Sequence, residues 1–524
     1  MASTFTRELD ARAQDKTGRR RWVFAAYDQL SAAIGPLARL DPRDAGLVLV
    51  ESPAKAARRS YHRQKLALIL ANQRQFALAQ AARGVAVRYV VSPGGYADAL
   101  APLARELGPL VHMRPAEREL RDDLAPLVAA GALVEVPHEG WLTTRAQFEA
   151  SQSGPPWRMD AFYRHVRRAS GVLMKGGRPV GGKWSFDAEN RRPWHGDPPA
   201  PEPPSFVPDA VTREVGALVE ERFAGHPGAV DLARLPATTA DAEAQWAWAK
   251  RACLPQFGPF EDAMSTRSSG LFHARLSPLI NLHRLLPRRV VDEAAALDIS
   301  LASREGFVRQ LIGWREFVRH VHEATDGFRA VPPGPLGAAR PLPPAFWGTR
   351  SGLACLDHVV ADVWREGWSH HITRLMVLSN LATLLDVSPR ALTDWFWVAY
   401  VDAFDWVVEP NVLGMGTYAV GGVMTTKPYV SGAAYLDRMS DYCQRCAFDP
   451  KRTCPVTRLY WAFLARHESA LAGNVRMAMP LRALGRRPAA ERAADARTFE
   501  RVSDTLTRGR ALDAAEEAPE SLGT

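Results

Sequence analysis

Short apolar runs alternate with helical segments through the first 135 residues, and this alternation restricts the fold more than any other feature. Five runs are typical of buried strands, at residues 22–26, 46–51, 85–91, 111–113 and 133–136. Residues 61–84 and 96–108 carry apolar side chains at helical spacing. Strand–helix–strand alternation predicts a parallel sheet with helices on both faces. We therefore expect an α/β domain over residues 1–140, with no glycine-rich nucleotide motif at its strand ends.

The strand signal ends before residue 240. Helical segments follow one another from there, and ten of the fifteen tryptophans lie among them, which predicts an all-α domain with an aromatic interior over residues 236–508. Residues 141–235 are expected to form a long irregular linker, because seven of the sixteen residues from 193 to 208 are proline. Residues 509–524 are predicted to be a flexible acidic tail.

The charge balance narrows the class of partner. The formal charge is +9, and the last fourteen residues hold four acidic groups and no Lys or Arg, so the rest of the chain carries +13. A basic excess favours nucleic acid or another polyanion. Neither a signal-peptide pattern nor a run of about 18 apolar residues is present, so we expect a soluble cytoplasmic protein that does not enter a membrane.

Cysteine placement is the sharpest chemical signal. Cys443 and Cys446 form a C-x-x-C pair, Cys454 follows directly before a proline, and Cys355 lies about ninety residues earlier. Four thiols in one domain match the ligand demand of either Zn²⁺ or a cubane iron–sulfur cluster, and the spacing alone does not decide between them. Cys253 has no partner nearby and is expected to be a core residue.

A second constellation combines histidines with charged residues in an apolar sequence. His370 and His371 stand at a predicted helix start and could act as general acid or base near neutral pH. A buried aspartate in the segment 400–406 needs a cation, and Arg374 is a natural partner. Such a pair either holds the fold or belongs to a polar ring around a bound heterocycle. The segment from Leu271 to Ser277 is a candidate phosphate seat.

Taken together, these motifs resemble the iron–sulfur bacterial branch of the cryptochrome/photolyase family, which contains prokaryotic 6-4 photolyases and bacterial cryptochromes. The resemblance runs from residue 22 to about residue 467. The segments that carry it are GGKWSFDAENR from Gly181, QLIGWREF from Gln310, WSHHITRLMVLSN from Trp368, YVDAFDWVVEPNVLGMGTYA from Tyr400, TKPYVSGAAYLDRMSDYCQRC from Thr426 and CPVTRLYW from Cys454. It implies a Rossmann-like antenna domain, a long linker and a helical FAD-binding domain with an iron–sulfur site.

The resemblance also implies the cofactors and their ligands. Cys355, Cys443, Cys446 and Cys454 become the ligands of a [4Fe–4S] cluster. A folded FAD is expected to contact a set of residues in the helical domain: His273, Leu276, Ser277, Gln310, Trp314, Arg374, Asp402, Asp405 and Asn411. Further cofactor candidates are a 6,7-dimethyl-8-ribityllumazine antenna and Mg²⁺. The strand end Glu51-Ser-Pro53 departs from the usual antenna pattern.

The activity implied by the resemblance is light-dependent repair of UV-damaged DNA by a carbon–carbon lyase that acts on a flipped 6-4 pyrimidine–pyrimidone lesion. His371 matches the catalytic acid, with His370 and Tyr429 in support. Electrons would reach the flavin along Trp395, Trp347 and Tyr435. DNA contacts are expected from Lys183, Trp184, Arg191 and Lys427. The protein is expected to be a monomer. The alternatives are a blue-light receptor of the same fold and a metal-stabilised DNA-binding module without light chemistry.

Overall fold

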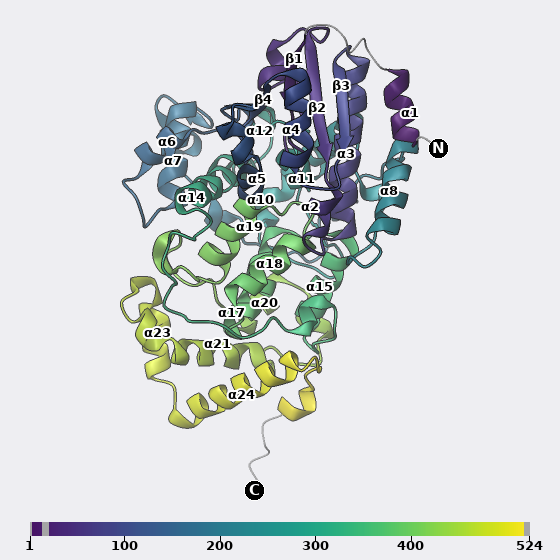
Figure 1. Cartoon of the computed structure of the whole chain (residues 1–524). Helices are drawn as coiled ribbons and strands as arrows, with labels where there is room; N and C mark the ends of the chain where they lie inside the picture. The colour runs from purple at the N-terminus through teal and green to yellow at the C-terminus, as the bar shows by residue number, and fades with distance from the viewer. Residues whose placement is uncertain (1–2, 13–19, 518–524) are drawn as a thin grey trace.

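The computed structural model describes residues 3–12 and 20–517, and a five-stranded parallel sheet forms its N-terminal part (Figure 1). The sheet order is β3-β2-β1-β4-β5. The strands are β1 Arg21–Phe24, β2 Ala45–Glu51, β3 Ala86–Val91, β4 Leu110–Met113 and β5 Leu133–Val136. Every residue of β2 is buried, as expected for a strand covered by helices on both faces. The predicted α/β domain with a parallel sheet is confirmed.

Five helices accompany the sheet: α1 Thr4–Ala11, α2 Pro53–Ala57, α3 Arg63–Ala82, α4 Tyr96–Leu107 and α5 Arg118–Ala129. Helix α3 also joins this domain to the helical remainder of the chain. The buried Lys65 ammonium donates to the carbonyl oxygens of Trp397 and Ala403 at 2.8 and 2.6 Å. The His62 amide, just before the helix, donates to the carbonyl of Val398 at 2.8 Å. These bonds fix the sheet domain against the helices that carry the candidate site.

The segment between the domains is more ordered than the irregular linker that we expected. It contains α6 Arg145–Ser151, α7 Met159–Ser170, the small hairpin β6 Met174–Lys175 and β7 Arg178–Pro179, and α8 Ala210–Arg222. Val211 of α8 packs in one core cluster with Val23 and Leu47, so α8 adds to the core of the sheet domain. The proline-rich stretch 193–208 itself contains no helix or strand. Its missing N–H donors and fixed φ angles account for this.

All regular elements described from residue 239 onward are helical, apart from one bridge between Arg340 and Val387. The α-helices are α9 Thr239–Trp248, α10 Leu254–Phe260, α11 Ser277–Asn281, α12 Pro287–Ala296, α13 Leu301–Val308, α14 Glu316–Thr325, α15 Ala354–Glu366, α16 His371–Thr373, α17 Asn380–Leu384, α18 Pro389–Ala399, α19 Asp405–Glu409, α20 Ala433–Met439, α21 Pro455–Arg466, α22 Glu468–Leu471, α23 Ala478–Gly485 and α24 Ala489–Thr507. The predicted helical remainder of the chain is confirmed.

Several helices continue into wider π-helical turns, namely η5 Ala249–Cys253, η6 Arg309–Arg315, η8 Arg374–Ser379 and η9 Pro410–Gly416. Short 3₁₀ turns complete the chain: η1 Pro36–Arg39, η2 Val180–Gly182, η3 Asp187–Glu189, η4 Leu232–Arg234, η7 Pro344–Trp347, η10 Gly421–Val423, η11 Tyr442–Arg445, η12 Val475–Met477 and η13 Ala514–Glu517. Turns of π type occur frequently at functional sites. Four of the predicted flavin contacts, Gln310, Trp314, Arg374 and Asn411, lie on them.

The C-terminal segment is anchored for longer than predicted. Leu512 lies within the expected flexible tail, yet it is buried and its amide donates to the carbonyl of Ser351 at 2.8 Å. The beginning of the tail is therefore held against the helical domain by one apolar side chain and one main-chain bond. Residues 518–524 of the predicted tail lie outside the described residues.

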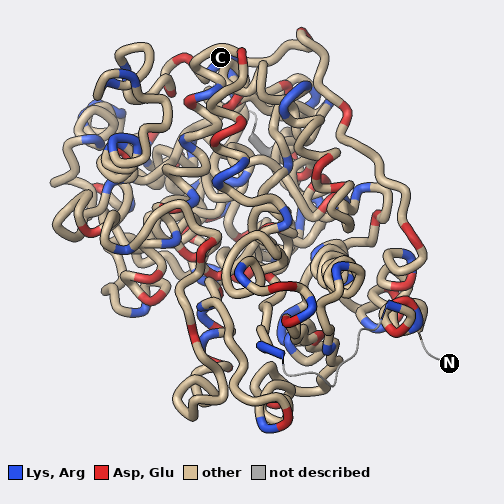
Figure 2. The backbone as a smooth tube through the Cα atoms, turned by 90° about the horizontal axis from the view of Figure 1, so that it is seen from above, with Lys and Arg blue, Asp and Glu red and all other residues tan. Residues whose placement is uncertain are grey.

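The described residues contain no helix with the length and apolar character needed to span a bilayer. Lys/Arg and Asp/Glu residues are interspersed along the chain in Figure 2. The basic excess therefore does not form one uniform field over the face shown, and any DNA-binding surface must be argued from individual residues.

Candidate functional site

Three histidines meet where α16 begins. The rings of His273 and His370 stack at a centroid distance of 4.5 Å with 7° between their planes, and the ring of His371 lies 5.3 Å from that of His273. One ring nitrogen from each of the three lies within 4.8 Å of the other two. His273 and His370 are buried, while 43% of the His371 side chain is exposed. The predicted catalytic pair is thus divided into one interior ring and one accessible ring.

Burial sets the protonation of the two interior rings. Desolvation lowers the pKa of His273 and of His370 well below the ordinary value, and neighbouring positive groups add to this effect. Both rings are therefore neutral near pH 7, and they cannot donate a second proton. His371, on the exposed side of the cluster, is the histidine that remains available for proton transfer.

The exposed histidine is placed beside the loop that we predicted to bind DNA. His371 Nε2 lies 3.7 Å from a carboxylate oxygen of Asp262, and Asp262 also lies 3.8 Å from Nε of Arg191. Arg191 in turn forms an ion pair with Asp187. Asp262 therefore links the expected acid to a residue of the expected DNA-binding loop, although neither link is a short hydrogen bond.

Two predicted tyrosines belong to the same region. Burial raises the pKa of Tyr435, and the charge of Asp262 raises it further, while burial and the charge of Asp187 raise the pKa of Tyr429. Both phenols therefore stay protonated at neutral pH and can donate a hydrogen bond. Tyr435 lies here, beside Asp262, and has no described ring contact with the tryptophans that we expected it to assist.

A buried carboxylate next to Asp262 connects Gln310 to this cluster. Glu261 accepts from the amides of Gln310 and Asn190, each at 2.6 Å, and lies 3.4 Å from a guanidinium nitrogen of Arg309. Burial nevertheless raises its pKa above the ordinary value. Gln310 is therefore held in place by Glu261, a partner that the sequence motifs did not indicate.

The second polar group is a bidentate ion pair. Arg374 donates from both Nη atoms to the carboxylate of Asp402 at 3.0 Å each, and the Ser277 hydroxyl donates to the same carboxylate at 2.6 Å. The guanidinium carbon stands 4.0 Å over the ring of Tyr400. Such a pair is geometrically specific and charge-assisted. Arg374 also lowers the pKa of both interior histidines, which places the two groups side by side.

A cavity of about 460 Å³, within the usual size range of small-molecule pockets, is lined by chain neighbours of these groups such as Pro278 and Val401. One wall is the hydroxyl-rich segment Thr266–Leu271, and Arg275 and Trp368 form part of another. Among the described residues, His273 Nε2, His370 Nδ1 and Trp368 Nε1 are buried and have no hydrogen-bond partner. Buried polar atoms are rarely left unpaired, so these three indicate a missing polar ligand.

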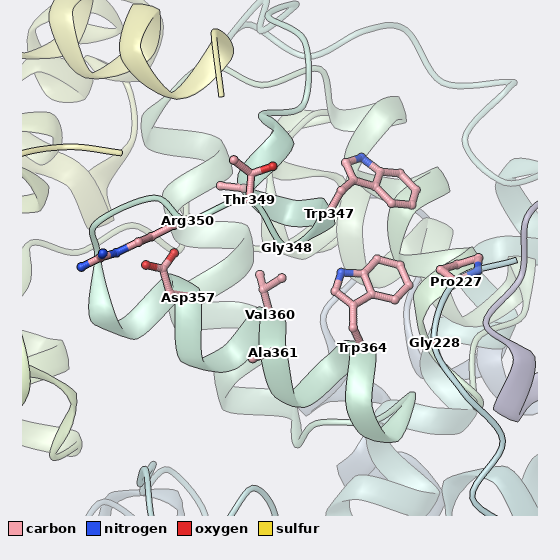
Figure 3. Close-up of a pocket in the computed structure, with 11 residues that line it drawn as sticks. Pro227, Gly228, Trp347, Gly348, Thr349, Arg350, Asp357, Val360, Ala361 and Trp364 are labelled. Atoms are coloured by element: carbon pink, nitrogen blue, oxygen red, sulfur yellow. The ribbon is translucent and has the colours of Figure 1, made fainter. Parts of the chain in front are cut away.

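Aromatic rings lead from the surface to this cluster. The ring of Trp347, half exposed, stacks on that of Trp364 at 5.4 Å (Figure 3). Trp364 meets the buried Trp395 at 5.9 Å. Trp395 lies 6.0 Å from Tyr400, the ring below Arg374. The carbonyl oxygen of Phe346 accepts from the indole nitrogens of both Trp364 and Trp395 at 2.9 Å. The two predicted relay tryptophans are therefore joined through a third.

His62 holds the middle of this aromatic series. Its ring stacks on Trp364 at 5.9 Å and hydrogen-bonds the Trp364 carbonyl oxygen at 3.1 Å, and burial lowers its pKa from 6.5 to about 4. Because the unfolded chain binds a proton on His62 below pH 6.5 and the native chain does not, acid favours unfolding. Between pH 6.5 and about 4 this residue should lower the free energy of unfolding by roughly 1.4 kcal/mol per pH unit.

A comparison with His62→Gln measures the effect. Chemical denaturation measures the free energy of unfolding at pH 7 and at pH 4.5. The decrease between the two pH values should be about 2 to 3 kcal/mol smaller in the variant than in the wild type. Equal pH dependence in the two proteins would contradict a buried, neutral His62.

The four predicted metal-ligating cysteines come together from separate elements. Cys355 lies in the first turn of α15, Cys443 in η11 and Cys454 immediately before α21. Burial raises the pKa of Cys355, and the other three thiols raise it further by their charge. Burial also raises the pKa of Cys443 and Cys454 to about 12. All described cysteines are free thiols, and Cys253 is buried apart from this group.

Other predicted site residues lie elsewhere. Asp405 accepts from the main-chain amide of Arg118 at 2.7 Å, against the sheet domain. Asn411 donates to the Val407 carbonyl of its own helix at 2.8 Å, and Trp314 makes its ring contact with Phe317. None of the three has a described contact with the histidines or with the Arg374–Asp402 pair. Burial, with the charge of Glu117, raises the pKa of Asp405 to about 6.

The predicted DNA-binding residues surround the loop between α7 and α8. Lys183 is exposed and paired with Glu189 at 3.2 Å, and the Trp184 ring lies 4.7 Å below the guanidinium of Arg168. Lys427 is half-buried and has no described ion pair. Arg191, of these four, is the residue that reaches Asp262.

Comparisons with known proteins agree with this arrangement. Residues 21–234 match the family model described as deoxyribodipyrimidine photo-lyase-related protein. The chain is 34% identical over 480 residues to the (6-4) photolyase of Agrobacterium fabrum, with 87% of this chain and 94% of that protein covered. A class III photolyase from Agrobacterium tumefaciens has a similar structure at 15% identity, with a TM-score of 0.54 and coverage of 94% of this chain and 99% of that one.

A Synechocystis cryptochrome also has a TM-score of 0.54, at 16% identity, over 77% of this chain and 84% of that one. These two structural likenesses establish the fold. The 34% identity over nearly all of the Agrobacterium fabrum protein goes further. The chain belongs to the cryptochrome/photolyase family.

Proposed function

We propose that this protein repairs UV-damaged DNA in a light-dependent reaction and that its substrate is the 6-4 pyrimidine–pyrimidone lesion. One observation carries the proposal. The accessible histidine, His371, stands beside Asp262, and Asp262 reaches the arginine of the basic loop. A proton donor and a phosphate-binding residue therefore face the same space. The likeness to a (6-4) photolyase over almost the whole chain supports this assignment of the substrate.

The residues around the 460 Å³ cavity fit FAD, the cofactor that membership of the family implies. The Arg374–Asp402 pair, with Ser277, would hold the polar edge of the ring system. Arg275 and Ser269, which in this structure bond to Glu366, and Thr266, which bonds to Asp441, would turn to the phosphates. When bound and reduced, this cofactor supplies the light-driven electron for lesion cleavage. Reversal of the lesion is redox-neutral overall, so the electron returns, and Trp347, Trp364 and Trp395 would provide the route by which an oxidised cofactor is reduced again.

His371 has the geometry of the proton donor. Its ring nitrogen lies 3.7 Å from a carboxylate oxygen of Asp262, and its exposure lets a flipped base approach. The two neutral rings behind it orient it without competing for the proton. His371 would protonate the hydroxyl that leaves the lesion, and Tyr429 and Tyr435 would donate hydrogen bonds at the edge of the same space.

The direct test is photorepair of a defined lesion. Protein reduced and loaded with FAD is illuminated with an oligonucleotide that contains a single 6-4 photoproduct, and restored thymines are measured by chromatography. We expect repair in blue light and none in the dark. A parallel oligonucleotide with a cyclobutane dimer tests the choice of lesion. No restored thymine from either lesion would overturn the repair assignment in favour of a blue-light receptor.

We also propose a [4Fe–4S] cluster on Cys355, Cys443, Cys446 and Cys454. A tetrahedral zinc site with Zn–S bonds of 2.3 Å needs sulfur atoms roughly 3.8 Å apart. Among the described residues, only the three histidines of the cluster have ligand atoms that all lie within 4.8 Å of one another. No three of the four thiols are that close. The thiols are near enough to shift each other's pKa and yet more widely spaced than one zinc ion requires, which supports a larger cluster.

Cys443→Ser should abolish the cluster. We expect loss of the visible absorption and of bound iron, with a strong decrease in soluble protein, because the cluster joins α15 to the segments before α21. Cys253→Ser is the matched control and should retain iron, since that thiol lies apart from the other four. Purified wild type that contains zinc and no iron would contradict the cluster.

The antenna is less well supported by the structure. The pocket at the strand ends has a volume of about 70 Å³, below the roughly 300 Å³ typical of small-molecule sites. Lys55 pairs with Glu117 there at 2.6 Å, and Tyr27 hydrogen-bonds the same carboxylate. The volume and the paired charges do not fit a ribityllumazine. Mg²⁺ stays a prediction from the resemblance.

Arg191 should carry part of the DNA affinity. Arg191→Ala removes one phosphate-binding cation and frees Asp262 and Asp187, so we expect weaker binding to all DNA sequences. The slope of log K against log salt should decrease by about one. Fluorescence anisotropy over a salt series measures both effects. Arg482→Ala, an exposed arginine of α23, serves as the control, and equal slopes in the two variants would contradict the assignment.

A further inference from the structure

A second large cavity opens at the outer end of the aromatic series. It has a volume of about 610 Å³ and is lined by Pro227 and Gly228, by the segment 345–350, and by one face of α15 (Figure 3). This pocket lies away from the predicted DNA-binding loop. Trp184 of that loop packs on α7, and α7 and α15 are on opposite sides of the molecule in Figure 1.

The lining offers two recognition elements at opposite ends of the pocket. The indole of Trp347 is 51% exposed at one end, and the guanidinium of Arg350 lies at the other (Figure 3). Between them stands Gly348, whose φ of +97° favours glycine and whose missing side chain leaves open space.

Of the two charged side chains in the lining, Asp357 and Arg350, only Arg350 is free to bind a ligand. Asp357 already accepts from the Ser351 amide at 2.8 Å, from the Ser351 hydroxyl at 2.6 Å and from the Gly352 amide at 3.2 Å. Arg350, by contrast, has no hydrogen bond or ion pair with any described residue. The pocket thus combines one exposed aromatic face with one unpaired cation. A planar heterocycle that bears a phosphate group matches both.

The position of Trp347 indicates what such a ligand would do. From this ring the contacts run through Trp364 and Trp395 to Tyr400, with centroid distances of 5.4, 5.9 and 6.0 Å. Each indole nitrogen of the inner pair is fixed by the same carbonyl oxygen. A ligand stacked on the exposed ring would therefore be the outermost member of a continuous aromatic series that ends at the Arg374–Asp402 pair.

We propose that this pocket binds a phosphate-bearing planar reductant, a reduced nicotinamide or reduced flavin nucleotide, which delivers electrons to Trp347. The inference rests on the proposed function, in which inward electron transfer leaves Trp347 oxidised. The reductant gives one electron to the Trp347 radical cation, which returns to neutral tryptophan. The donor heterocycle is oxidised by one electron and releases one proton to water. Arg350 holds the phosphate, and the indole face holds the ring.

Binding is measured in the dark, independently of repair, with NADH and reduced FMN as separate probes and tryptophan fluorescence as the readout. We expect saturable quenching by at least one probe. Arg350→Ala should raise its Kd at least tenfold, while Arg482→Ala, an exposed arginine of α23, should leave Kd unchanged. The probe with the lower Kd identifies the source of the ligand. No saturable binding, or equal Kd values in the two arginine variants, would overturn the proposal.

A second readout separates this inference from the proposed function. Arg350→Ala protein that is chemically reduced before illumination should repair DNA as the wild type does, while its recovery from the oxidised state with the nucleotide donor should slow at least tenfold. Wild-type protein that binds the donor but repairs no lesion would remove the repair assignment and leave the binding site. Recovery at the wild-type rate in Arg350→Ala would exclude the electron-donor role.

Discussion

Replacement of His371 by alanine should lower the photorepair rate by roughly 10²- to 10⁴-fold, the usual contribution of a positioned proton donor. His371 is the exposed ring of the histidine cluster and faces Asp262 at 3.7 Å, so the substitution removes the proton source and little packing. Flavin content and melting temperature should remain those of the wild type. The measurement is the initial rate of thymine restoration under saturating blue light.

The control for this experiment is His195→Ala, an exposed histidine of the proline-rich segment outside the site. It should repair at the wild-type rate. Asp262→Asn should fall between the two, because it removes the carboxylate that faces His371 but leaves the ring in place. A His371→Ala protein that repairs normally would show that another group supplies the proton.

Asp402→Ala should cost about 3 to 5 kcal/mol of stability and should also abolish flavin retention. The carboxylate is 7% exposed and accepts from both Nη atoms of Arg374, so its removal leaves a largely buried cation that keeps only its Nε bond to the Ser369 carbonyl. The Ser277 hydroxyl loses its acceptor as well. Denaturant unfolding measures the first effect, and the ratio of flavin to protein absorbance measures the second.

A double variant separates folding from cofactor binding. Arg374→Met combined with Asp402→Leu removes both charges and keeps most of the volume, so much of the lost stability should return. Flavin should not return, because the polar edge of the site is gone. Recovery of flavin in the double variant would mean that the ion pair holds the fold and contributes nothing to the cofactor.

The architecture could be predicted from the sequence because apolar strand runs alternate with helical patterns in the N-terminal part and only helical patterns follow residue 239. The strands of the sheet domain are continuous apolar runs, as in β2, which is buried on both faces. The linker prediction failed at α8 because its polar residues suggested an irregular segment, whereas Val211 and its neighbours pack on the sheet domain. A short helix that is stabilised by tertiary packing has only a weak sequence signal.

The parts of the candidate site that lie in sequence motifs were predicted. The parts that are brought together only by tertiary packing were missed. Arg374 with Asp402, and the four cysteines, carry distinctive spacings. Asp262 and Trp364 have no such spacing. Asp262 meets His371 from a different segment of the chain, and Trp364, on α15, stands between two relay tryptophans from other segments. The π-helical turns add a further obstacle, because an extra residue per turn changes which side chains share a face.

The shared main-chain acceptor of the two inner indoles affects which substitutions this part of the protein can tolerate. The oxygen that orients Trp364 and Trp395 belongs to the main chain of Phe346, so no side-chain replacement at that position removes it directly. The spacing of the inner rings is therefore protected from the commonest kind of mutation. Drift in this part of the protein should instead concentrate on the outer ring and on Arg350, where a new donor could be accommodated while the inner path stays as it is.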